Sequence, residues 1–332
     1  MTAYRRFGAG IQNSAYGALR RLISPSQLPP PAGPGDRVGV AALSGPVDPA
    51  RLEAGLAGLR RLGFEPVLAD NVLSRDGLFA GGDAERLAAF HRLAADPDLP
   101  AIFFTRGGYG LMRVLPALDW DLLRRRPRAY VGYSDLTPFL LEVVRRLGLV
   151  SFHGPLVAGE LARGLDAGEE ESLLGALAGR YPAAQPFSGW LREPASGEAR
   201  GVLLGGCLSL LTATLGTPFA PELEGGLVFW EDVNEPPYKI DRMLTHLGLS
   251  GTLANIAGMI VGQIGNGPMA NGQNPDGEAL DWRALVGGGV AGFSWPVAWG
   301  LSSGHFAPNW TLPLGLPARL EGRGSRLVLG EG

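Results

Sequence analysis

Apolar runs of strand length alternate with segments of helical spacing along the first half of the chain. The run at 101–105 is continuously apolar up to its last residue, and 49–62 places Leu52, Leu56 and Leu59 on one helical face. Such strands separated by amphipathic helices are typical of a parallel sheet covered on both faces. The pattern predicts an N-terminal parallel-sheet (flavodoxin-like) α/β domain. We expect its strands at 37–43, 65–68, 101–105, 129–132 and 149–152, and its helices at 49–62, 84–94 and 136–147.

The second half of the chain has a different pattern, in which short apolar runs are broken by glycine and proline. This pattern is typical of a β-rich domain, and we expect one that is smaller and mixed. The expected strands are 201–204, 227–231, 257–263, 297–301 and 326–329, and the expected helices are 208–215 and 237–247. The predicted parts are an N-terminal arm (1–35) with a short helix at 11–23, the α/β domain (36–157), a connecting segment (158–198) and the β-rich C-terminal domain (199–332).

The composition agrees with a folded chain that is rich in tight turns. Of 332 residues, 51 are glycine and 27 are proline, while 45% are hydrophobic and only 18% are charged. A chain of this composition buries a core rather than staying open through charge repulsion. Its length exceeds the roughly 250–300 residues at which single cores stop growing, which favours two domains.

Charge and cysteine content narrow the classes of partner. The net charge of −3 does not favour binding to nucleic acid or to an anionic membrane. No apolar run approaches the roughly 18 residues that a membrane span needs. The one cysteine, Cys207, excludes an internal disulfide, and the first thirty residues lack the apolar stretch of a secretory signal. We therefore expect a cytoplasmic protein that acts on a small molecule.

Three turns at the ends of the predicted parallel strands are the first places to look for chemistry. Open α/β sheets bind ligands at the carboxyl ends of their strands. The turns are Ser44-Gly45-Pro46, Arg106-Gly107-Gly108-Tyr109-Gly110 and Gly132-Tyr133-Ser134-Asp135. None matches a dinucleotide-binding or phosphate-loop motif, which disfavours a nucleotide cofactor.

The third turn resembles a nucleophile elbow. Such an elbow lifts a serine hydroxyl above the sheet and points the next backbone N–H at a developing oxyanion. Ser134 is the serine here and Asp135 supplies the N–H, although Leu136 stands where an elbow has glycine. An ordinary helix start, with Ser134 or Asp135 as its N-cap, is the alternative.

A serine nucleophile needs a base, and the chain offers four histidines. His91 and His246 lie within helical segments, where histidines are usually surface or packing residues. His153 ends the fifth predicted strand, and His305 stands in a glycine-containing turn after an apolar strand. The sequence alone does not separate His305 from His153.

The base also needs a carboxylate that orients its imidazole. Glu231 and Asp232 directly follow the apolar strand at 227–231. Either acid orients a catalytic histidine or caps the next helix, and Glu235 is a reserve candidate. The order serine, acid, histidine is that of α/β-hydrolases, although chain order does not define a triad.

The glycine turn after 101–105 adds two further candidates. Gly107 and Gly108 tolerate a positive φ and therefore allow a backbone N–H to point at an oxyanion. Arg106 is suited to a two-pronged contact with a substrate carboxylate, with a structural ion pair as the alternative.

Seven motifs in register resemble the LD-carboxypeptidase family of serine peptidases, typified by muramoyltetrapeptide carboxypeptidase. They are PPPAGPGDRVGV, TRGGYG, VGYSDLT, SFHGP, GGCLSLL, FWEDVNEPPYKIDRML and SSGHFAPN, and they span roughly Pro29 to Leu329. The chain departs from the family pattern in two places. The arm before Pro29 is longer, and Ala42-Leu43 precedes Ser44 where the family has alanine-proline.

The resemblance implies a fold, an assembly and a set of roles. It implies an α/β domain followed by a β domain, an active site at their junction and a homodimer, without a metal or other cofactor. Ser134 is then the nucleophile, Glu231 the acid and His305 the base. The backbone of Asp135 and the Gly107-Gly108 turn supply the oxyanion donors, and His153 falls back to a structural or rim role.

Three functions follow as hypotheses. The first is a cytoplasmic serine LD-carboxypeptidase that releases the terminal D-alanine of murein tetrapeptides in cell-wall recycling. The second is an immunity peptidase that cleaves the amide of microcin C-type peptidyl-nucleotides, which are a second substrate class of the family. The third is a non-catalytic muropeptide-binding protein, whose affinity for peptide would not depend on His305.

Overall fold

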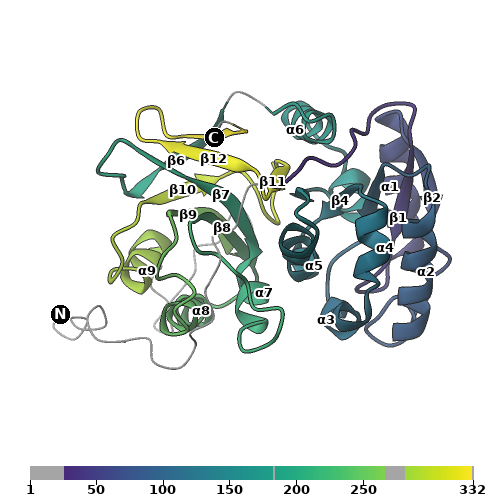
Figure 1. Ribbon diagram of the computed structural model, residues 1–332, viewed down its shortest axis with the longest axis horizontal. Helices are drawn as coiled ribbons and strands as arrows, with labels where there is room; N and C mark the ends of the chain where they lie inside the picture. The colour runs from purple at the N-terminus through teal and green to yellow at the C-terminus, as the bar shows by residue number, and fades with distance from the viewer. Residues whose placement is uncertain (1–25, 182–183, 266–280, 331–332) are drawn as a thin grey trace.

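A six-stranded sheet forms the first half of the computed structural model, which describes residues 26–181, 184–265 and 281–330 (Figure 1). Its strands are β1 (Arg37–Ala41), β2 (Glu65–Leu68), β3 (Ala101–Phe104), β4 (Ala129–Gly132), β5 (Ser151–His153) and β11 (Leu312–Leu314). Their order is β11-β5-β4-β3-β1-β2, and the first five strands along the chain pair in parallel. The predicted parallel-sheet α/β architecture is confirmed.

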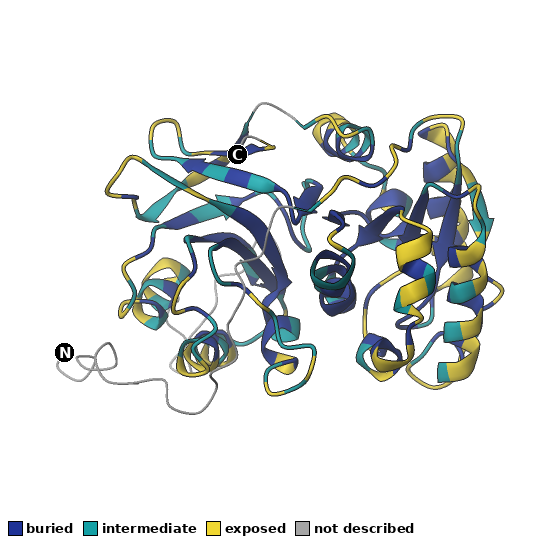
Figure 2. Cartoon of the chain, in the orientation of Figure 1, coloured by how far each residue is buried: buried dark blue, intermediate teal, exposed yellow. Residues whose placement is uncertain are grey.

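Helices follow these strands along the chain and bury apolar residues in the core. They are α1 (Pro49–Arg61), α2 (Asp83–Ala95), α3 (Leu111–Val114), α4 (Trp120–Arg125), α5 (Thr137–Glu142) and α6 (Ala167–Leu177). α1 shows why the sequence folds this way: Asp48 accepts the N–H of Arg51 as N-cap, Pro49 opens the helix, and its leucines face the core. Figure 2 shows the same division, with exposed residues on the outer helix faces and buried residues along the strands.

A closed barrel forms the second half. Its strands are β6 (Gln185–Arg192), β7 (Glu198–Cys207), β8 (Gly226–Val233), β9 (Gly258–Gly265), β10 (Val297–Leu301), β12 (Pro317–Glu321) and β13 (Arg326–Leu329). The order is β10-β6-β13-β12-β7-β8-β9, in which β7, β8, β9 and β10 run parallel. The helices α7 (Leu208–Ala213), α8 (Pro237–Leu249) and α9 (Trp282–Gly289) accompany it. The predicted β-rich second half is thus confirmed, and its form is a barrel.

Two strands differ from the sequence expectations. β6 lies in the expected connecting segment, yet it pairs with β10 and β13 and completes the barrel. β11 lies in the C-terminal part of the chain, yet it pairs antiparallel with β5 of the first sheet. β6 lacks a continuous apolar run and β11 has only three residues, so neither has a strong local signal. The helix expected at 11–23 lies outside the described residues.

The helices of the described segments give no sign of a membrane span. None of them combines the length with the apolar character that crossing a bilayer requires.

One helix contact depends on glycine. α1 packs against the turn at Val157–Leu161, and a Cβ added to Gly55 would stand 1.9 Å from the carbonyl oxygen of Val157. Gly287 in α9 is a matched contrast, since a Cβ there would meet no described atom within 4 Å.

We predict opposite stability changes for Gly55→Ala and Gly287→Ala. Alanine improves helix propensity at both positions by about 0.5–1 kcal/mol. At Gly55 the clash outweighs this gain, and overpacking costs of about 1–3 kcal/mol lower the free energy of unfolding. Urea unfolding of both variants measures the difference, and a Gly55→Ala protein as stable as the wild type would contradict the described packing.

Candidate active site

Three strand-to-helix turns of the parallel sheet meet at the carboxyl ends of β1, β3 and β4. The N–H of Gly45, after β1, donates to the carbonyl oxygen of Gly107, after β3, over 3.1 Å. Gly107 lies against Ser134, after β4, because a Cβ added to Gly107 would stand 2.8 Å from the Ser134 Cβ. The three turns therefore form one continuous surface, and position 107 admits only glycine without a shift of the turn that carries Ser134.

Ser134 occupies a strained turn. Its φ of +63° lies in the left-handed region, where a non-glycine residue costs on the order of 1–3 kcal/mol. Neither Ser134 nor Asp135 caps the helical segments that follow. The carboxylate of Asp135 instead accepts the N–H of Leu111 over 2.9 Å and so holds the Arg106–Gly110 turn beside Ser134. The structure has the elbow-like turn and not the helix cap.

His305 bridges Ser134 and Glu231. Its Nε2 lies 3.1 Å from the Ser134 Oγ, and its Nδ1 lies 2.6 Å from the Glu231 Oε2. When the ring proton is on Nδ1 and is donated to the carboxylate, Nε2 is free to accept the serine hydroxyl. This connection is the one through which a histidine activates a serine hydroxyl.

Glu231 reaches His305 from an irregular position in β8. The pairing of β8 with β9 shifts register between Trp230 and Asp232, and such irregularities redirect a side chain. Gly304 supplies the matching space, because a Cβ there would stand 3.0 Å from the Glu231 Oε2. Glu231 itself is completely buried. Its hydrogen bond to His305 is therefore shielded from water, which strengthens it.

The other acids near this strand have different partners. Asp232 accepts the N–H of Ser209 in α7 over 2.7 Å and that of Val233 in β8 over 2.8 Å. Burial and the neighbouring Glu231 raise the pKa of Asp232 to about 6. Glu235 pairs with Lys239 over 3.1 Å at the start of α8. Of the three candidate acids, only Glu231 contacts the histidine.

His153 does not occupy the place of a base. It is completely buried, and neither ring nitrogen has a hydrogen-bond partner among the described residues. Burial lowers the pKa of His153 to about 3, so the ring is neutral at physiological pH. Its ring packs against Tyr133 and Phe229 instead.

The pKa of His305 is the net result of opposing effects. Burial lowers this pKa, but the charge and hydrogen bond of Glu231 and the charges of Asp232 and Glu160 outweigh burial, so the pKa lies above its usual 6.5. An imidazole with a raised pKa takes a proton from a hydroxyl more readily.

Arg106 and Gly108 lie on the rim of this surface. The Arg106 Nη1 donates to the Pro46 carbonyl over 3.0 Å, and Arg106 forms no ion pair with any described residue. The alternative of a structural ion pair for Arg106 is therefore not found in the described structure. Gly108 has a φ of +99°, which favours glycine, and a Cβ there would stand 3.4 Å from the Arg106 Nη2. The guanidinium group is exposed and largely free for a ligand.

Thr137 ties the serine turn to the barrel and was not singled out from the sequence. Its Oγ1 donates to the Ser134 carbonyl over 2.8 Å and accepts the N–H of Cys207 over 3.0 Å. Cys207 is the register partner of Glu231 on the neighbouring strand. Thr137 thus fixes the barrel strands that carry the acid relative to the turn that carries the serine.

Arg86 is a second residue that sequence reasoning missed. It is completely buried, its Nη1 donates to the carbonyls of Leu43 and, over 2.9 Å, Gly110, and its Nη2 pairs with Asp83 over 2.6 Å. It therefore ties the first strand-end turn to the second. The signal was available, since Arg86 falls on the same helical face as the buried Phe90 and an arginine on such a face needs a partner.

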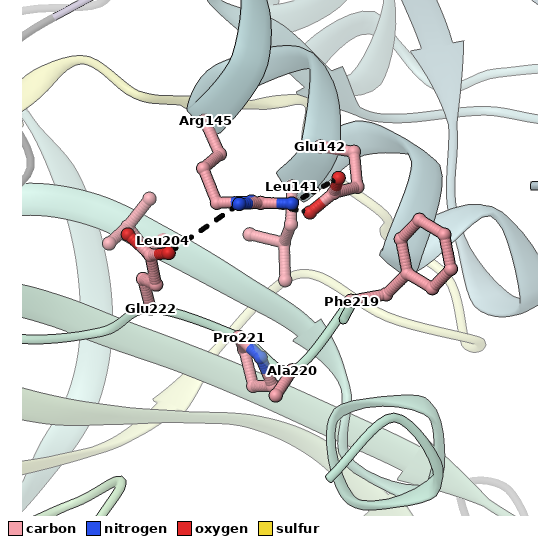
Figure 3. Close-up of a pocket in the computed structure, with 8 residues that line it drawn as sticks. All are labelled: Leu141, Glu142, Arg145, Leu204, Phe219, Ala220, Pro221 and Glu222. Atoms are coloured by element: carbon pink, nitrogen blue, oxygen red, sulfur yellow. Dashed lines mark hydrogen bonds and ion pairs between the residues drawn. The ribbon is translucent and has the colours of Figure 1, made fainter. Parts of the chain in front are cut away.

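A separate small pocket lies between α5 and the segment at 219–222, as Figure 3 shows. Arg145 bridges Glu142, at 2.6 Å, and Glu222, at 3.6 Å, inside this pocket. None of Ser134, Glu231 and His305 lines it. We read it as an ion-paired joint between the two halves, because its cation already has two acidic partners. In the described part of the chain, no three His, Cys, Asp or Glu side chains group as metal ligands do.

Two family profiles match the chain, and together they cover most of it. The LD-carboxypeptidase N-terminal domain matches residues 38–154, and the LD-carboxypeptidase C-terminal domain matches residues 200–320.

Named relatives match over nearly their full length. A Streptomyces coelicolor protein that is named as a carboxypeptidase is 40% identical, over 94% of this chain and 97% of the relative. The murein tetrapeptide carboxypeptidase of Pseudomonas aeruginosa is 31% identical, over 86% and 93%. The microcin C7 self-immunity protein of Escherichia coli is 28% identical, over 89% and 93%. The crystal structure of muramoyltetrapeptide carboxypeptidase from Oxalobacter formigenes superposes with a TM-score of 0.78 at 29% identity, covering 89% of this chain and 99% of that one.

We predict that Arg86→Lys destabilises the protein by about 2 kcal/mol or more. Lysine keeps the charge but lacks the fork that reaches two carbonyls, and each buried acceptor left unsatisfied costs about 1–3 kcal/mol. Arg113→Lys is the matched control, because Arg113 pairs with the same Asp83 but is half exposed. We expect the control within about 0.5 kcal/mol of the wild type in urea unfolding. Equal stability of the two variants would contradict the tie described for Arg86.

Proposed function

This chain belongs to the LD-carboxypeptidase family, and from that premise we propose that it is a serine carboxypeptidase that removes the terminal D-alanine from murein tetrapeptides. The single observation that carries the mechanism is the chain of hydrogen bonds from Ser134 through His305 to Glu231, at 3.1 and 2.6 Å. The murein tetrapeptide carboxypeptidase among its relatives supports the substrate.

In the proposed reaction, the Ser134 Oγ attacks the carbonyl that precedes the terminal D-residue. The His305 Nε2 takes the hydroxyl proton as general base and then gives it to the leaving amine. The buried carboxylate of Glu231 stabilises the imidazolium that forms between these steps. D-alanine departs, a water molecule deacylates Ser134 by the same proton route, and the shortened peptide is released.

The developing oxyanion lies, in this proposal, between two backbone elements. One is the N–H of Asp135, which a nucleophile elbow directs at the oxyanion. The other is the turn at Gly107 and Gly108. The Asp135 nitrogen lies 3.3 Å from where a Cβ of Gly107 would stand, so the two elements border the same space beside Ser134. Donors fixed in this way stabilise the transition state because they need no reorganisation.

Arg106 is proposed to bind the carboxylate of the terminal D-residue. A carboxypeptidase must distinguish a free C-terminus from an internal peptide bond, and a bidentate guanidinium contact recognises a carboxylate. Arg106 is exposed at the rim of the serine turn, and no described acid occupies it.

A second candidate substrate is a microcin C-type peptidyl-nucleotide. The relation to the microcin C7 self-immunity protein favours this candidate, since it covers 89% of this chain at 28% identity. The same three residues would cleave the amide of such a compound by the same steps, so the substrate alone separates the two functions.

We further propose a cytoplasmic location and a homodimer. The single cysteine supports a reducing compartment, and the family resemblance supports the dimer.

Substitution of the three site residues is expected to abolish turnover while the protein stays folded. Ser134→Ala should lower kcat by roughly four to six orders of magnitude, and Glu231→Gln by about four. Mass spectrometry of a murein tetrapeptide, and in parallel of an aminoacyl sulfamoyl adenylate, shows which bond is cut.

His246→Gln is the control for this experiment, because His246 is exposed on α8, and we expect its turnover to be unchanged. Full tetrapeptide cleavage by Ser134→Ala would refute the mechanism. Cleavage of the adenylate alone would replace the first substrate by the second. If the wild-type protein binds the peptide without cleaving it, and the His305→Ala variant binds it with the same affinity, only a binding function would remain.

For Arg106→Ala we expect kcat/KM on the tetrapeptide to fall about 10- to 100-fold. This is the magnitude of a lost hydrogen-bonded contact to a charged group, about 1.5–3 kcal/mol. A tetrapeptide with a C-terminal amide is the control, because it lacks the charge that Arg106 would bind. Wild type and variant should therefore cleave the amide at the same low rate. An equal loss on both substrates would show that Arg106 does not read the carboxylate.

A further inference from the structure

Four aromatic rings form a column that leads from the barrel to the proposed base. Phe229 on β8 packs edge-on against His153 on β5, with ring centroids 5.1 Å apart. His153 lies 5.2 Å from Tyr133, and Tyr133 lies 4.8 Å from His305 at an interplanar angle of 68°. Tyr133 is therefore both the residue before the serine and the residue against which the imidazole rests.

Tyr133 is itself held at its far end. Its hydroxyl donates to the Glu160 Oε1 over 2.7 Å, and the Glu160 Oε2 accepts the N–H of Leu156 over 3.0 Å. Glu160 is buried in the turn at Val157–Leu161, against which α1 packs. Arg51 of α1 adds a hydrogen bond of 2.9 Å to the carbonyl of Ala158 in the same turn. Both carboxylate oxygens are thus engaged, and the tyrosine lies between the segment at Val157–Leu161 and the imidazole.

We propose that Glu160, acting through Tyr133, is a positioning residue for His305: the pair fixes the place of the imidazole, and the buried carboxylate stabilises the imidazolium formed during proton transfer. The inference rests on the proposed function. Rigid support of this kind matters because a base must stay within hydrogen-bond reach of the hydroxyl it deprotonates.

Several charged or titratable groups surround His305, and the charge of Glu160 is one of those that affect the pKa of His305. Glu231 and Asp232 face it from β8, His153 and Tyr133 face it from the parallel sheet, and Glu160 acts from behind Tyr133. The charge of Glu160 raises the pKa of His305 together with the two acids of β8, against the effect of burial. Removing that one charge must therefore move the His305 pKa downwards.

The test compares Glu160→Gln, Tyr133→Phe and the double variant with Tyr130→Phe. Tyr130 is the matched control, because it is a completely buried tyrosine of β4 whose hydroxyl has no described partner. For both single variants we expect kcat on the tetrapeptide to fall about 3- to 10-fold, with KM within about twofold, since the lost contacts are roughly single hydrogen bonds. The kcat of the double variant should be only slightly below that of the less active single variant, because the two side chains act as a unit.

Glu160→Gln carries a second readout that a purely structural role would not move. The acid limb of the kcat/KM profile, which reports the free enzyme's base, should shift to lower pH, since without the carboxylate the imidazole holds its proton less strongly. Tyr130→Phe should leave kcat and the limb unchanged. An unshifted limb, or equal losses in Tyr133→Phe and Tyr130→Phe, would overturn the proposal.

An NMR titration of His305 separates this inference from the proposed function. The His305 ring signal is assigned as the one missing from His305→Gln, and its pKa is measured in wild type and Glu160→Gln without any substrate. A lower pKa in Glu160→Gln supports the electrostatic part even if the tetrapeptide is not the substrate. An unchanged pKa overturns it even if the tetrapeptide is cleaved.

Discussion

Two hydrogen bonds of His305 set the constraint that the rest of the structure satisfies. They require a serine from the parallel sheet and a glutamate from the barrel to lie on opposite sides of one imidazole, at 3.1 and 2.6 Å. Small shifts between the two halves would break one of these contacts. Several features hold the halves in register: β11 pairs with β5, Thr137 bonds both the serine turn and Cys207, and Arg145 joins α5 to the segment at 219–222.

Burial strengthens the electrostatic interaction between Glu231 and His305. Glu231 is completely buried, and its second oxygen has no hydrogen-bond partner among the described residues. A buried carboxylate with one partner interacts strongly with that partner, because water does not screen it. The pKa of His305 is raised in consequence, despite the burial that opposes it. The same burial raises the pKa of Asp232, which is stabilised by backbone N–H groups and not by the histidine.

Part of the high glycine content is explained by positions where two segments of the site approach each other closely. Gly107 lies against Ser134 and Gly304 against Glu231, and a Cβ on Gly206 would stand 2.6 Å from the Thr137 Oγ1. Each of these glycines removes a side chain from a place where two segments of the site meet. Other glycines have no such role, since a Cβ added to Gly287 or Gly288 would meet no described atom within 4 Å.

The sequence by itself determined the local parts of this protein. Continuous apolar runs and leucine spacing located the parallel strands and α1, because burial on both faces leaves a periodic record along the chain. Motifs that resemble those of the family pointed to Ser134, Glu231 and His305 as candidates. Their residue types alone left His153 level with His305 and Glu231 level with Asp232.

Only the tertiary structure separated these pairs. His153 and Asp232 differ from His305 and Glu231 in what surrounds them, and the two partners of His305 lie 74 and 171 residues away along the chain. β11, β6 and the contact between Tyr133 and Glu160 left no strong local signal for the same reason. Local patterns record which residues are buried, whereas the partner that a buried polar group finds depends on how distant strands and turns pack together.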